Sequence, residues 1–532
     1  SMIIQEKRKK IAVFAAFCIG MLIIAYELVK KLIARVYPFD EFGWMCLFIV
    51  IAIIALPIVL YLLAFVFKAE FHWCYLTAGL TLGIIFMFFI PPYATPDEVN
   101  HTWSTYYVSD KILGYGETTD PDATILVRKG EAGAPLSTVI SRRVYNDFLH
   151  NAFVMEEPGF GELVDSYQVY STPHLLYFIP AIGVTIGRIF HWGAVPSILL
   201  GTLLNVLFFV LSATYAMKKI PFGKMILASV CLLPMTLQQT SSLSYDNAII
   251  TSSIVIIALG IKWCFSEENI EKNEIVAYFI FTFILLIAKG GIYATVCLLP
   301  FLYRFSKAKN KKMWQKYKVP IILLIIMVIV VLGTGKVSEL AKTMFDSASA
   351  ADSVESATEN VNIIQWAGEE GYTVSWILEN PFETIRIFVM TFVLNWRFYL
   401  HSLIGDPLGW MQLSLSNKCV YAFIAIGLLS TISSKSDKIF MSAGNKVFLF
   451  GSTFVTALLC ALAMFLFYSP KSYGVILGLQ GRYFLPFYLA ILLCFRNRKI
   501  SIKYNIEKIL LIANVFLCSY VVVNFLHGFS FQ

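Results

Sequence analysis

Charged residues are scarce in this chain of 532 residues: Asp, Glu, Lys and Arg make up 14% of it, whereas hydrophobic residues make up 58%. A soluble globular domain carries roughly 25% charged residues. Ten-residue segments of alternating polarity, which are typical of membrane-spanning β-barrels, are also absent from the sequence. The composition therefore excludes a water-soluble domain as the main part of the chain, and it excludes a barrel.

Several chemical motifs are missing as well. None of the ten cysteines forms a CxxC pair, and all lie within or at the edge of apolar segments, which argues against a zinc site and a disulfide framework. The sequence has no Walker A loop, no HExxH and no GxSxG. A nucleotide-driven pump, a zinc protease and a serine hydrolase therefore have no support.

Long apolar segments are what the sequence has in abundance. A bilayer core of about 30 Å needs about 20 helical residues to cross it, and segments of that length recur from one end of the chain to the other. We therefore expect an all-α fold, a polytopic transmembrane helical bundle of about 13 spans. The predicted spans are 11–28, 44–67, 73–91, 196–216, 222–239, 246–264, 274–288, 291–304, 320–335, 418–432, 446–467, 482–495 and 507–526.

The basic residues set the expected topology. Although the formal net charge is +8, a value that could suggest nucleic acid, these residues gather in short loops between predicted spans. The positive-inside rule places such loops in the cytoplasm. With a cytoplasmic N-terminus, indicated by the basic run at 7–10, the rule leaves residues 92–195 and 336–417 outside the membrane. The basic group at 30–35 disagrees with this topology, because it would also lie outside.

Each external segment contains a moderately apolar stretch, at 174–190 and 383–404. Counting either stretch as a span would invert the basic loops that follow it, so we expect both to form helices in the membrane interface. Residues 345–372 are small, polar and acidic, which is typical of an exposed loop or lid.

The most informative stretch runs from Pro91 to His101 and reads Pro-Pro-Tyr-Ala-Thr-Pro-Asp-Glu-Val-Asn-His. Within it, Thr95, Pro96 and Glu98 match a capping box with Thr95 at the N-cap and Pro96 in the first helical position. This pattern predicts a helix that runs to about Gly114. Capping accounts for these three residues.

Capping leaves Asp97 and His101 without a structural assignment, four residues apart on one helical face. A carboxylate and an imidazole in this position can accept a proton from a substrate hydroxyl, with Glu98 as the alternative base. They can also hold a divalent cation such as Mg²⁺ or Mn²⁺ together. An acidic first turn is common on helix-dipole grounds alone, so a purely structural interpretation stays open.

A second element, Gln-Gly-Arg-Tyr-Phe-Leu-Pro, occupies residues 480–486 at the external mouth of the twelfth predicted span. Arg482 there breaks the positive-inside pattern. One interpretation is an arginine that snorkels to the interface beside Tyr483. The other is a phosphate ligand, because a guanidinium offers a planar fork of donors that matches phosphate oxygens.

Other polar residues are candidates for the same external site. Tyr245 and Asp246 begin the sixth predicted span, where Asp246 could instead serve as a helix cap. Lys289 interrupts an apolar run, and it is either the exposed tip of a tight hairpin or a cation turned toward an anionic lipid headgroup. His174 and Arg397 could line the cavity, although single residues of this kind are more often ordinary interfacial residues.

On its PDExxH and GRYxxP elements the chain resembles a family of bacterial multi-pass membrane proteins, which is in turn similar to the type-C glycosyltransferases. The similarity covers about residues 73–500, a core with the external loops 92–195 and 336–417. Residues 1–72 look like two additional N-terminal transmembrane helices, and 501–532 like a C-terminal one. Enzymes of that superfamily take a sugar from a polyprenyl-phosphate carrier on the outer face of the membrane.

The resemblance implies that Asp97, or Glu98, acts at the acceptor and that Arg482 and Tyr483 engage the lipid phosphate. The expected function is transfer of a sugar from a polyprenyl-phosphate donor to a cell-envelope glycan or lipid-linked acceptor, outside the bacterial cytoplasmic membrane. Membrane lipids are expected partners and nucleic acid is not. The alternatives are a transporter or flippase of lipid-linked saccharides, and a polysaccharide polymerase or ligase that moves whole chains.

Overall fold

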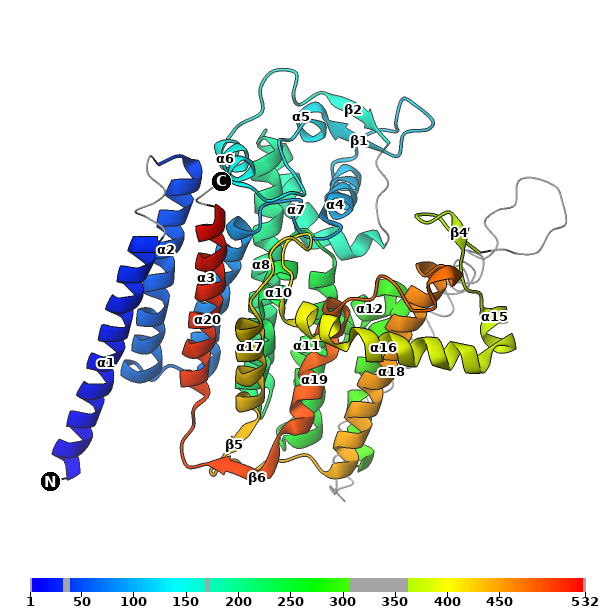
Figure 1. The fold of residues 1–532 in the computed structure, drawn as a ribbon. Coiled ribbons are helices and arrows are strands. Elements are labelled where there is room, and N and C mark those ends of the chain that lie inside the picture. Colours follow the sequence, from blue (N-terminus) through cyan, green and yellow to red (C-terminus); the bar gives the residue numbers. More distant parts are fainter. Residues whose placement is uncertain (1, 32–38, 168–172, 306–361, 530–532) are drawn as a thin grey trace.

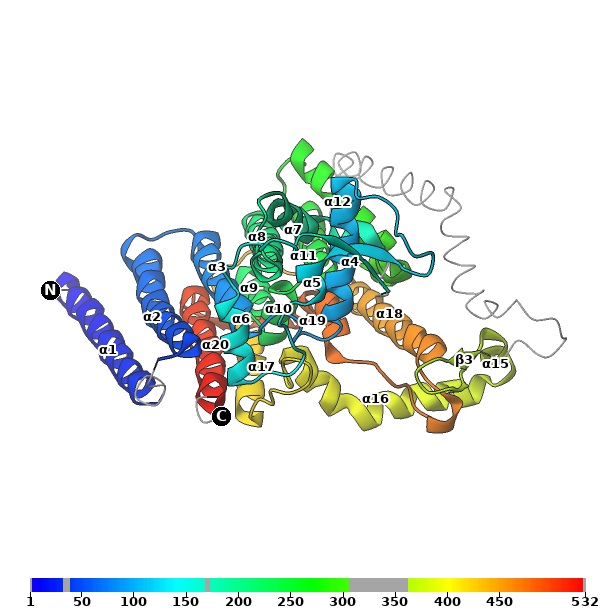
Figure 2. The ribbon, with the colours of Figure 1, turned by 90° about the horizontal axis from the view of Figure 1, so that it is seen from above.

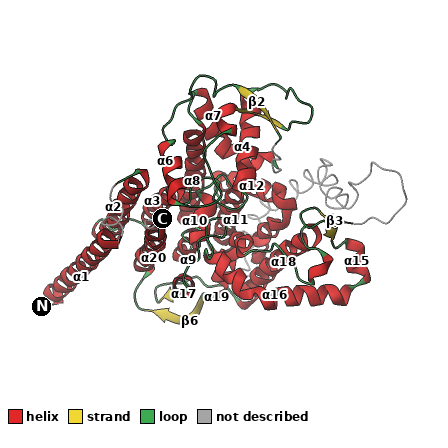
Figure 3. Cartoon of the chain, turned by 45° about the horizontal axis from the view of Figure 1, so that its top comes forward, coloured by secondary structure: helices red, strands yellow, loops and turns green. Residues whose placement is uncertain are grey.

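The computed structural model describes residues 2–31, 39–167, 173–305 and 362–529. Helices dominate these residues, and many of them run side by side along one direction (Figures 1 and 3). The strands form three two-stranded sheets, β1 (Ile125–Arg128) with β2 (Leu163–Ser166), β3 (Ile363–Ile364) with β4 (Glu369–Glu370), and β5 (Ile432–Ser434) with β6 (Asn497–Ile502).

In the described residues, eight helices are long and apolar enough to cross a membrane. They are α2 with η2 (Glu41–Val66), α3 (Phe71–Phe89), α8 (Ala194–Lys219), α11 (Asp246–Phe265), α12 (Lys272–Ile287) with the start of η4 (Ala288–Phe305), α16 (Pro381–Ile404), α18 (Ala443–Phe467) and α20 (Glu507–Phe529). Shorter apolar helices lie at Phe17–Leu28 in α1 (Met2–Lys31), in η3 (His174–Tyr177) with α7 (Phe178–Ile189), in α17 (Asn417–Ser430), and in η6 (Gly481–Phe484) with α19 (Leu485–Phe495).

The predicted span at 222–239 is wrong as a single helix. The chain forms two short helices there, α9 (Lys224–Cys231) and α10 (Pro234–Thr240), with a break between them. Pro234 stands at the start of the second helix, and proline has no N–H to continue the hydrogen bonding of the first. The predicted span at 320–335 and most of the loop at 345–372 lie outside the described residues.

The Lys289-Gly290-Gly291 sequence reverses the chain. All three residues have left-handed backbone angles, with φ of 44°, 66° and 75°. Beyond the turn the chain runs back along α12. The Tyr278 hydroxyl on α12 donates a hydrogen bond of 2.8 Å to the carbonyl of Cys297, which shows that the two arms lie side by side. The chain therefore forms a hairpin here, so Lys272–Cys297 is not one straight helix. Lys289 is not its exposed tip, because its side chain is only 21% exposed and pairs with Asp246.

Two opposite ends of the bundle are clearly distinguished in Figure 1. The residues from α4 (Glu98–Leu113) to α7, with α5 (Lys129–Ala132), α6 (Arg142–His150) and the β1–β2 sheet, cover one end. We call it the outer cap because the sequence predicts that this end faces outward. Sheet β5–β6 lies at the other end, and three predicted cytoplasmic basic residues, Lys435, Arg498 and Lys499, lie in it or directly after β5. Helix α1 begins toward the β5–β6 end, and α20 ends toward the outer cap.

Helix α2 runs from the end of the bundle that carries the outer cap toward the opposite end. Asp40, which caps α2, accepts a hydrogen bond of 2.9 Å from the Arg142 guanidinium in the outer cap. At the far end of the bundle, the Lys508 amine donates to the carbonyls of Ala64 and Ala69, at 3.1 and 2.7 Å. The start of α2 therefore lies at the end that carries the outer cap, as the sequence-based topology places it.

Small residues allow the central helices to approach closely. All residues of α11 from Asp246 to Cys264 are buried. Helix α7 packs on α8 through Gly183, where a Cβ atom would come within 2.6 Å of the Gly201 Cα. Such contacts between glycines are a common way for helices to associate where lipid surrounds them.

Helix α16 runs crosswise to the other long helices in both Figure 1 and Figure 2. Length and composition would permit it to cross a membrane, but its direction matches the interfacial helix that the basic loops predict. The short helix α15 (Val374–Glu379) precedes it, and the β3–β4 hairpin lies near η5 (Lys471–Tyr473) through an ion pair between Glu370 and Lys471.

Candidate functional site

The Thr-Pro-Asp-Glu stretch opens α4 differently from the capping-box prediction. The helix begins at Glu98, and Asp97 occupies the N-cap with a left-handed backbone, φ 64° and ψ 6°. The Glu98 carboxylate does accept a hydrogen bond from the Thr95 amide, at 3.2 Å, but its other oxygen accepts one from the Leu243 amide, also at 3.2 Å. The contact with Leu243 ties the start of α4 to the segment before α11, so tertiary structure rather than local capping sets the helix start.

Glu98 is therefore a structural carboxylate. It is 2% exposed, and burial raises its pKa to about 7 although the two backbone amides stabilise the charged form. A carboxyl group held this way has both oxygens occupied by the protein. We therefore expect it to shape the site rather than to contact a substrate.

The Asp97 side chain, unlike that of Glu98, is open to solvent. Its side chain is 53% exposed, and one carboxylate oxygen lies 2.9 Å from the Arg482 guanidinium Nη2. These two residues are 385 positions apart in the sequence. The structure thus joins the PDExxH element to the GRYxxP element by an ion pair.

Arg482 is almost completely buried, with 5% of its side chain exposed. Its Nε and Nη1 atoms have no hydrogen-bond partner among the described residues. A buried donor without an acceptor costs roughly 1–3 kcal/mol, and more when the group is charged. Arg482 therefore has two nitrogens, with three N–H bonds between them, that a ligand with oxygen acceptors would satisfy.

The backbone beside Arg482 is fixed by α16. The Gly481 amide donates a hydrogen bond of 2.8 Å to the Ser402 hydroxyl, and a Cβ atom at residue 481 would collide with the backbone of Tyr399 and Leu403. The crosswise helix thus positions the arginine. Sequence reasoning missed this contact, since Ser402 belongs to no motif.

A second cation lies next to Arg482. The Lys289 amine is 2.8 Å from the Asp246 carboxylate and lies 4.7 Å from the centre of the Tyr483 ring, while the Arg482 guanidinium lies 5.3 Å from the centre of the same ring. Lys289 also faces the Tyr245 ring, at 5.2 Å. The predicted residues Asp246, Lys289, Arg482 and Tyr483 therefore form one cluster.

His101 completes this cluster from α4. It is 5% exposed, its Nδ1 lies 2.9 Å from the hydroxyl of Tyr177, and its ring packs edge-on against Tyr245. Burial lowers its pKa to about 4, and the nearby carboxylates of Asp246 and Asp97 oppose this only in part. His101 is therefore neutral near pH 7. Tyr177 was missed by sequence reasoning, because nothing in its local sequence distinguishes it.

The residues do not fit the divalent-cation site considered for Asp97 and His101. The Asp97 carboxylate pairs with a guanidinium and the His101 Nδ1 with a hydroxyl. Within the described ranges, no group of three or more His, Cys, Asp or Glu side chains is arranged to hold a metal ion. The polar contacts of Asp97 and His101 are therefore with Arg482 and Tyr177 respectively.

Two predicted residues lie apart from the cluster. His174 packs its ring against Tyr107, with 4.4 Å between ring centres, and Tyr107 lies nearly three turns along α4 from Asp97. Arg397 is exposed on α16 and makes no ion pair within the described part of the chain. Neither residue is brought to Arg482 by a hydrogen bond or ion pair.

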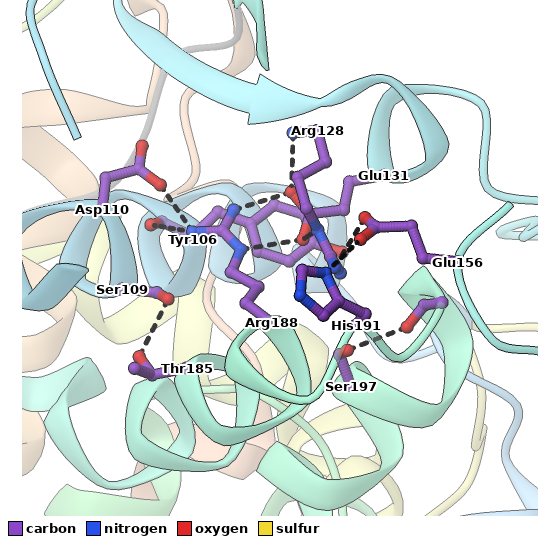
Figure 4. Close-up of polar contacts among 11 residues, drawn as sticks. Tyr106, Ser109, Asp110, Arg128, Glu131, Glu156, Thr185, Arg188, His191 and Ser197 are labelled. Carbon is purple, nitrogen blue, oxygen red and sulfur yellow. Dashed lines mark hydrogen bonds and ion pairs between the residues drawn. The ribbon is translucent and has the colours of Figure 1, made fainter. Parts of the chain in front are cut away.

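The outer cap contains a second polar network, shown in Figure 4. The Arg188 guanidinium bonds both oxygens of Glu131, at 2.8 and 2.7 Å, and one oxygen of Asp110, at 2.5 Å. Arg128 bonds Glu131 and Glu156, each at 2.8 Å. Burial opposes ionisation of Glu131, but the two guanidinium groups outweigh it and hold its pKa below the ordinary value. This network ties α4, α5 and α7 together, and no motif in the sequence pointed to it.

The fold and the cluster of Asp97, Asp246, Lys289 and Arg482 define a polytopic helical membrane protein with a charged site. The family model for the predicted membrane proteins of DUF2142 matches residues 80–491, and the chain belongs to that family. No curated protein matches the chain, and no solved structure does.

Proposed function

We propose that this protein is a membrane glycosyltransferase, which moves a sugar from a polyprenyl-phosphate donor to a glycan or lipid-linked acceptor at the outer face of the membrane. One observation carries the proposal. A buried arginine with two nitrogens that have no partner among the described residues lies beside an exposed carboxylate, in an apolar helical bundle. Such a bundle suits a lipid substrate, and such a pair suits a phosphate leaving group next to a base.

Arg482 and Lys289 supply the positive charge for the donor phosphate. The Nε and Nη1 of Arg482 lie on different edges of the planar guanidinium, and each shares its edge with Nη2. A phosphate that bonds either nitrogen therefore forms a strong two-donor contact by also bonding Nη2. Lys289 approaches the same Tyr483 ring. In the reaction, the bond between the sugar C1 and the phosphate oxygen breaks, its electron pair stays with the phosphate, and these two cations stabilise the resulting charge.

Asp97 is the group placed to act on the acceptor. Its exposed carboxylate can take the proton of the acceptor hydroxyl while the hydroxyl oxygen forms the new bond to C1. The proton ends on Asp97, and the products are the glycoside and the polyprenyl phosphate. No nucleotide takes part, because cleavage of the donor's sugar–phosphate bond drives the transfer.

The position of the charges favours an enzyme over a transporter. Transporters bind substrate near mid-membrane depth, commonly between structural repeats. Here Asp97, Asp246, Lys289 and Arg482 all lie at helix ends or turns rather than in the middle of a long helix, and ion pairs join them two by two. A polymerase or ligase would use the same lipid-phosphate chemistry, and the length of the transferred glycan distinguishes it.

The test is an assay of purified protein with a panel of radiolabelled undecaprenyl-phosphate sugars, which follows donor binding and transfer separately. Arg482→Lys keeps the charge but loses the fork, so we expect donor binding to weaken by about tenfold or more. Arg482→Ala should weaken it further. Arg386→Ala is the matched control, because Arg386 is exposed and its ion pair is with Glu383 on the same helix.

Unchanged donor affinity in Arg482→Ala would remove this residue from the site. Translocation of the intact lipid-linked sugar across vesicle membranes, without release of polyprenyl phosphate, would identify a flippase instead.

A further inference from the structure

The outer cap contains a cavity that the transfer site does not use. It has a volume of about 390 Å³, which lies within the usual range of small-molecule sites, roughly 300–1,000 Å³. Arg128, Glu131 and Glu156 of the buried network form part of its wall, and Glu157 and Asn151 another part. Asp110, which belongs to the same network, stands 13 positions after Asp97 on α4, about 20 Å along the helix axis.

We propose that this cavity binds a neutral saccharide. Beyond the transfer centre, it would hold a distal part of the glycan acceptor, and in that role the inference rests on the proposed function.

The groups on the cavity wall are suited to hydroxyls. Arg128 is 3% exposed, and its Nη2 has no hydrogen-bond partner in the described residues, so one donor is available. Glu157 is exposed, and its carboxylate makes no ion pair with any described residue, so an acceptor is available. Each sugar hydroxyl is both a donor and an acceptor. A ligand of this kind can satisfy both groups at once.

The charges argue against a small anion or a metal ion. Glu131, Glu156 and Glu157 outnumber Arg128 on the wall, so an anion would meet an excess of negative charge. A metal ion would meet the Arg128 guanidinium, and both oxygens of Glu131 and both of Glu156 already have partners. Phe160 and Met155 add apolar surface for the carbon face of a sugar ring.

One position allows the cavity to be filled without strain. Gly133 lines it, with φ −99° and ψ 14°, and a Cβ atom there would meet nothing closer than the Lys129 carbonyl at 3.6 Å. Gly133→Leu should therefore occupy the cavity and leave the backbone unchanged. Gly116→Leu is the matched control, because Gly116 lies in the same cap, does not line the cavity, and a Cβ atom there would meet nothing within 4 Å.

The experiment measures binding of four methyl glycosides, of glucose, galactose, mannose and N-acetylglucosamine, to the purified full chain by saturation-transfer NMR. We expect at least one glycoside to bind the parent protein and Gly116→Leu equally, and to bind Gly133→Leu about tenfold more weakly or worse. Melting curves verify that the variants are folded. Glu157→Ala, a change to an exposed side chain, should also weaken binding.

Each other result overturns the inference: no glycoside binds the parent, Gly133→Leu and Glu157→Ala bind like the parent, or Ca²⁺ alone displaces the glycoside from the cavity. The readout does not depend on transfer. Arg482→Ala should bind the glycoside like the parent. A parent protein that binds no glycoside contradicts this inference, whereas a parent protein that binds and transfers no polyprenyl-phosphate sugar contradicts the proposed function. The two failures can therefore be told apart.

Discussion

Asp97 has an unusual backbone for an L-amino acid. Its φ of 64° lies in the left-handed region, which costs an ordinary residue about 1–2 kcal/mol. Aspartate and asparagine tolerate this region better than most side chains, because they can form local hydrogen bonds. The conformation turns the Asp97 side chain away from the capping position and toward Arg482. Strain of this kind often occurs at functional sites.

The first prediction at this scale is that Asp97→Asn abolishes transfer and keeps the fold. Asparagine has nearly the same shape and tolerates the left-handed backbone, but its amide is a far weaker base. Expression should stay close to that of the parent, and the melting temperature should fall only slightly, because Asp97 is half-exposed. Donor binding should be at least as strong as in the parent, because the phosphate no longer competes with a carboxylate for Arg482 Nη2. Transfer at the parental rate would show that the base is Glu98, Asp246 or another group.

The second prediction concerns pH. The unfolded chain releases the Glu98 proton near its ordinary pKa of 4.5, whereas burial in the folded protein raises that pKa to about 7. Between these values the folded state binds more protons, so this residue's contribution to stability is present below about pH 4.5 and is lost as the pH rises through about 7.

Glu98→Gln should remove this dependence, because glutamine does not titrate. Its single amide oxygen can accept from only one of the Thr95 and Leu243 amides, so the variant should also melt at a lower temperature throughout. Melting temperatures at intervals from pH 4.5 to 8 should fall less steeply for Glu98→Gln than for the parent. Glu117→Gln, at an exposed position, is the control. Parallel curves for Glu98→Gln and the parent would contradict the assignment.

At the scale of elements, the contact between η6 and α16 determines the position of Arg482. We predict that Gly481→Ala separates them, because its Cβ would lie 2.7 Å from the Ser402 hydroxyl and would collide with the backbone of α16. Overpacking of this kind costs roughly 1–3 kcal/mol. Melting temperature and donor affinity should both fall.

Gly451→Ala is the matched control, since a Cβ at that helical position of α18 meets nothing within 4 Å. Alanine in a helix is more favourable than glycine by roughly 0.5–1 kcal/mol, so this variant should be at least as stable as the parent. A Gly481→Ala protein with parental melting temperature and donor affinity would show that α16 does not position the arginine.

The sequence predicted most helices, because apolar length alone identifies a segment that can cross a bilayer. The break before Pro234 was also predictable, but the apolar run obscured it. The start of α4 was not predictable from local rules. A capping box favoured Thr95, whereas the contact of Glu98 with Leu243, 145 positions away, fixed the start at Glu98.

The site was predictable only in its parts. The two motifs and the residues near 246 and 289 could be selected because charge is unexpected in an apolar chain. Their assembly depends on contacts between distant segments, such as the ion pair between Asp97 and Arg482, and no local pattern reports these. The network of Arg188, Glu131 and Arg128 was missed for the same reason.

At the scale of the whole molecule, the outer cap and the β5–β6 sheet lie at opposite ends of the bundle. The basic residues Lys435, Arg498 and Lys499 lie in the β5–β6 sheet or directly after β5, so the positive-inside rule predicts that the cap faces outward. A cysteine placed at Asp122, an exposed position beside Asp120, should react with a membrane-impermeant maleimide in intact cells.

Lys499→Cys, exposed on β6, should react only after lysis. Among the described residues, eight of the ten natural cysteines are buried and the other two, Cys18 and Cys494, are partly so, which limits background labelling. The reverse pattern, with Asp122→Cys protected until lysis, would place the site on the cytoplasmic side.

The ion pair between Asp97 and Arg482 also has a kinetic consequence. In the free protein the guanidinium holds the carboxylate that the proposed reaction requires as a base. A donor phosphate that takes over Nη2 would release Asp97, so the acceptor could be deprotonated only after the donor has bound. The proposed enzyme should then follow an ordered sequence, with the donor as the leading substrate and polyprenyl phosphate as the last product to leave. Product inhibition by polyprenyl phosphate that is competitive with the donor alone would support this order, and a random pattern would rule it out.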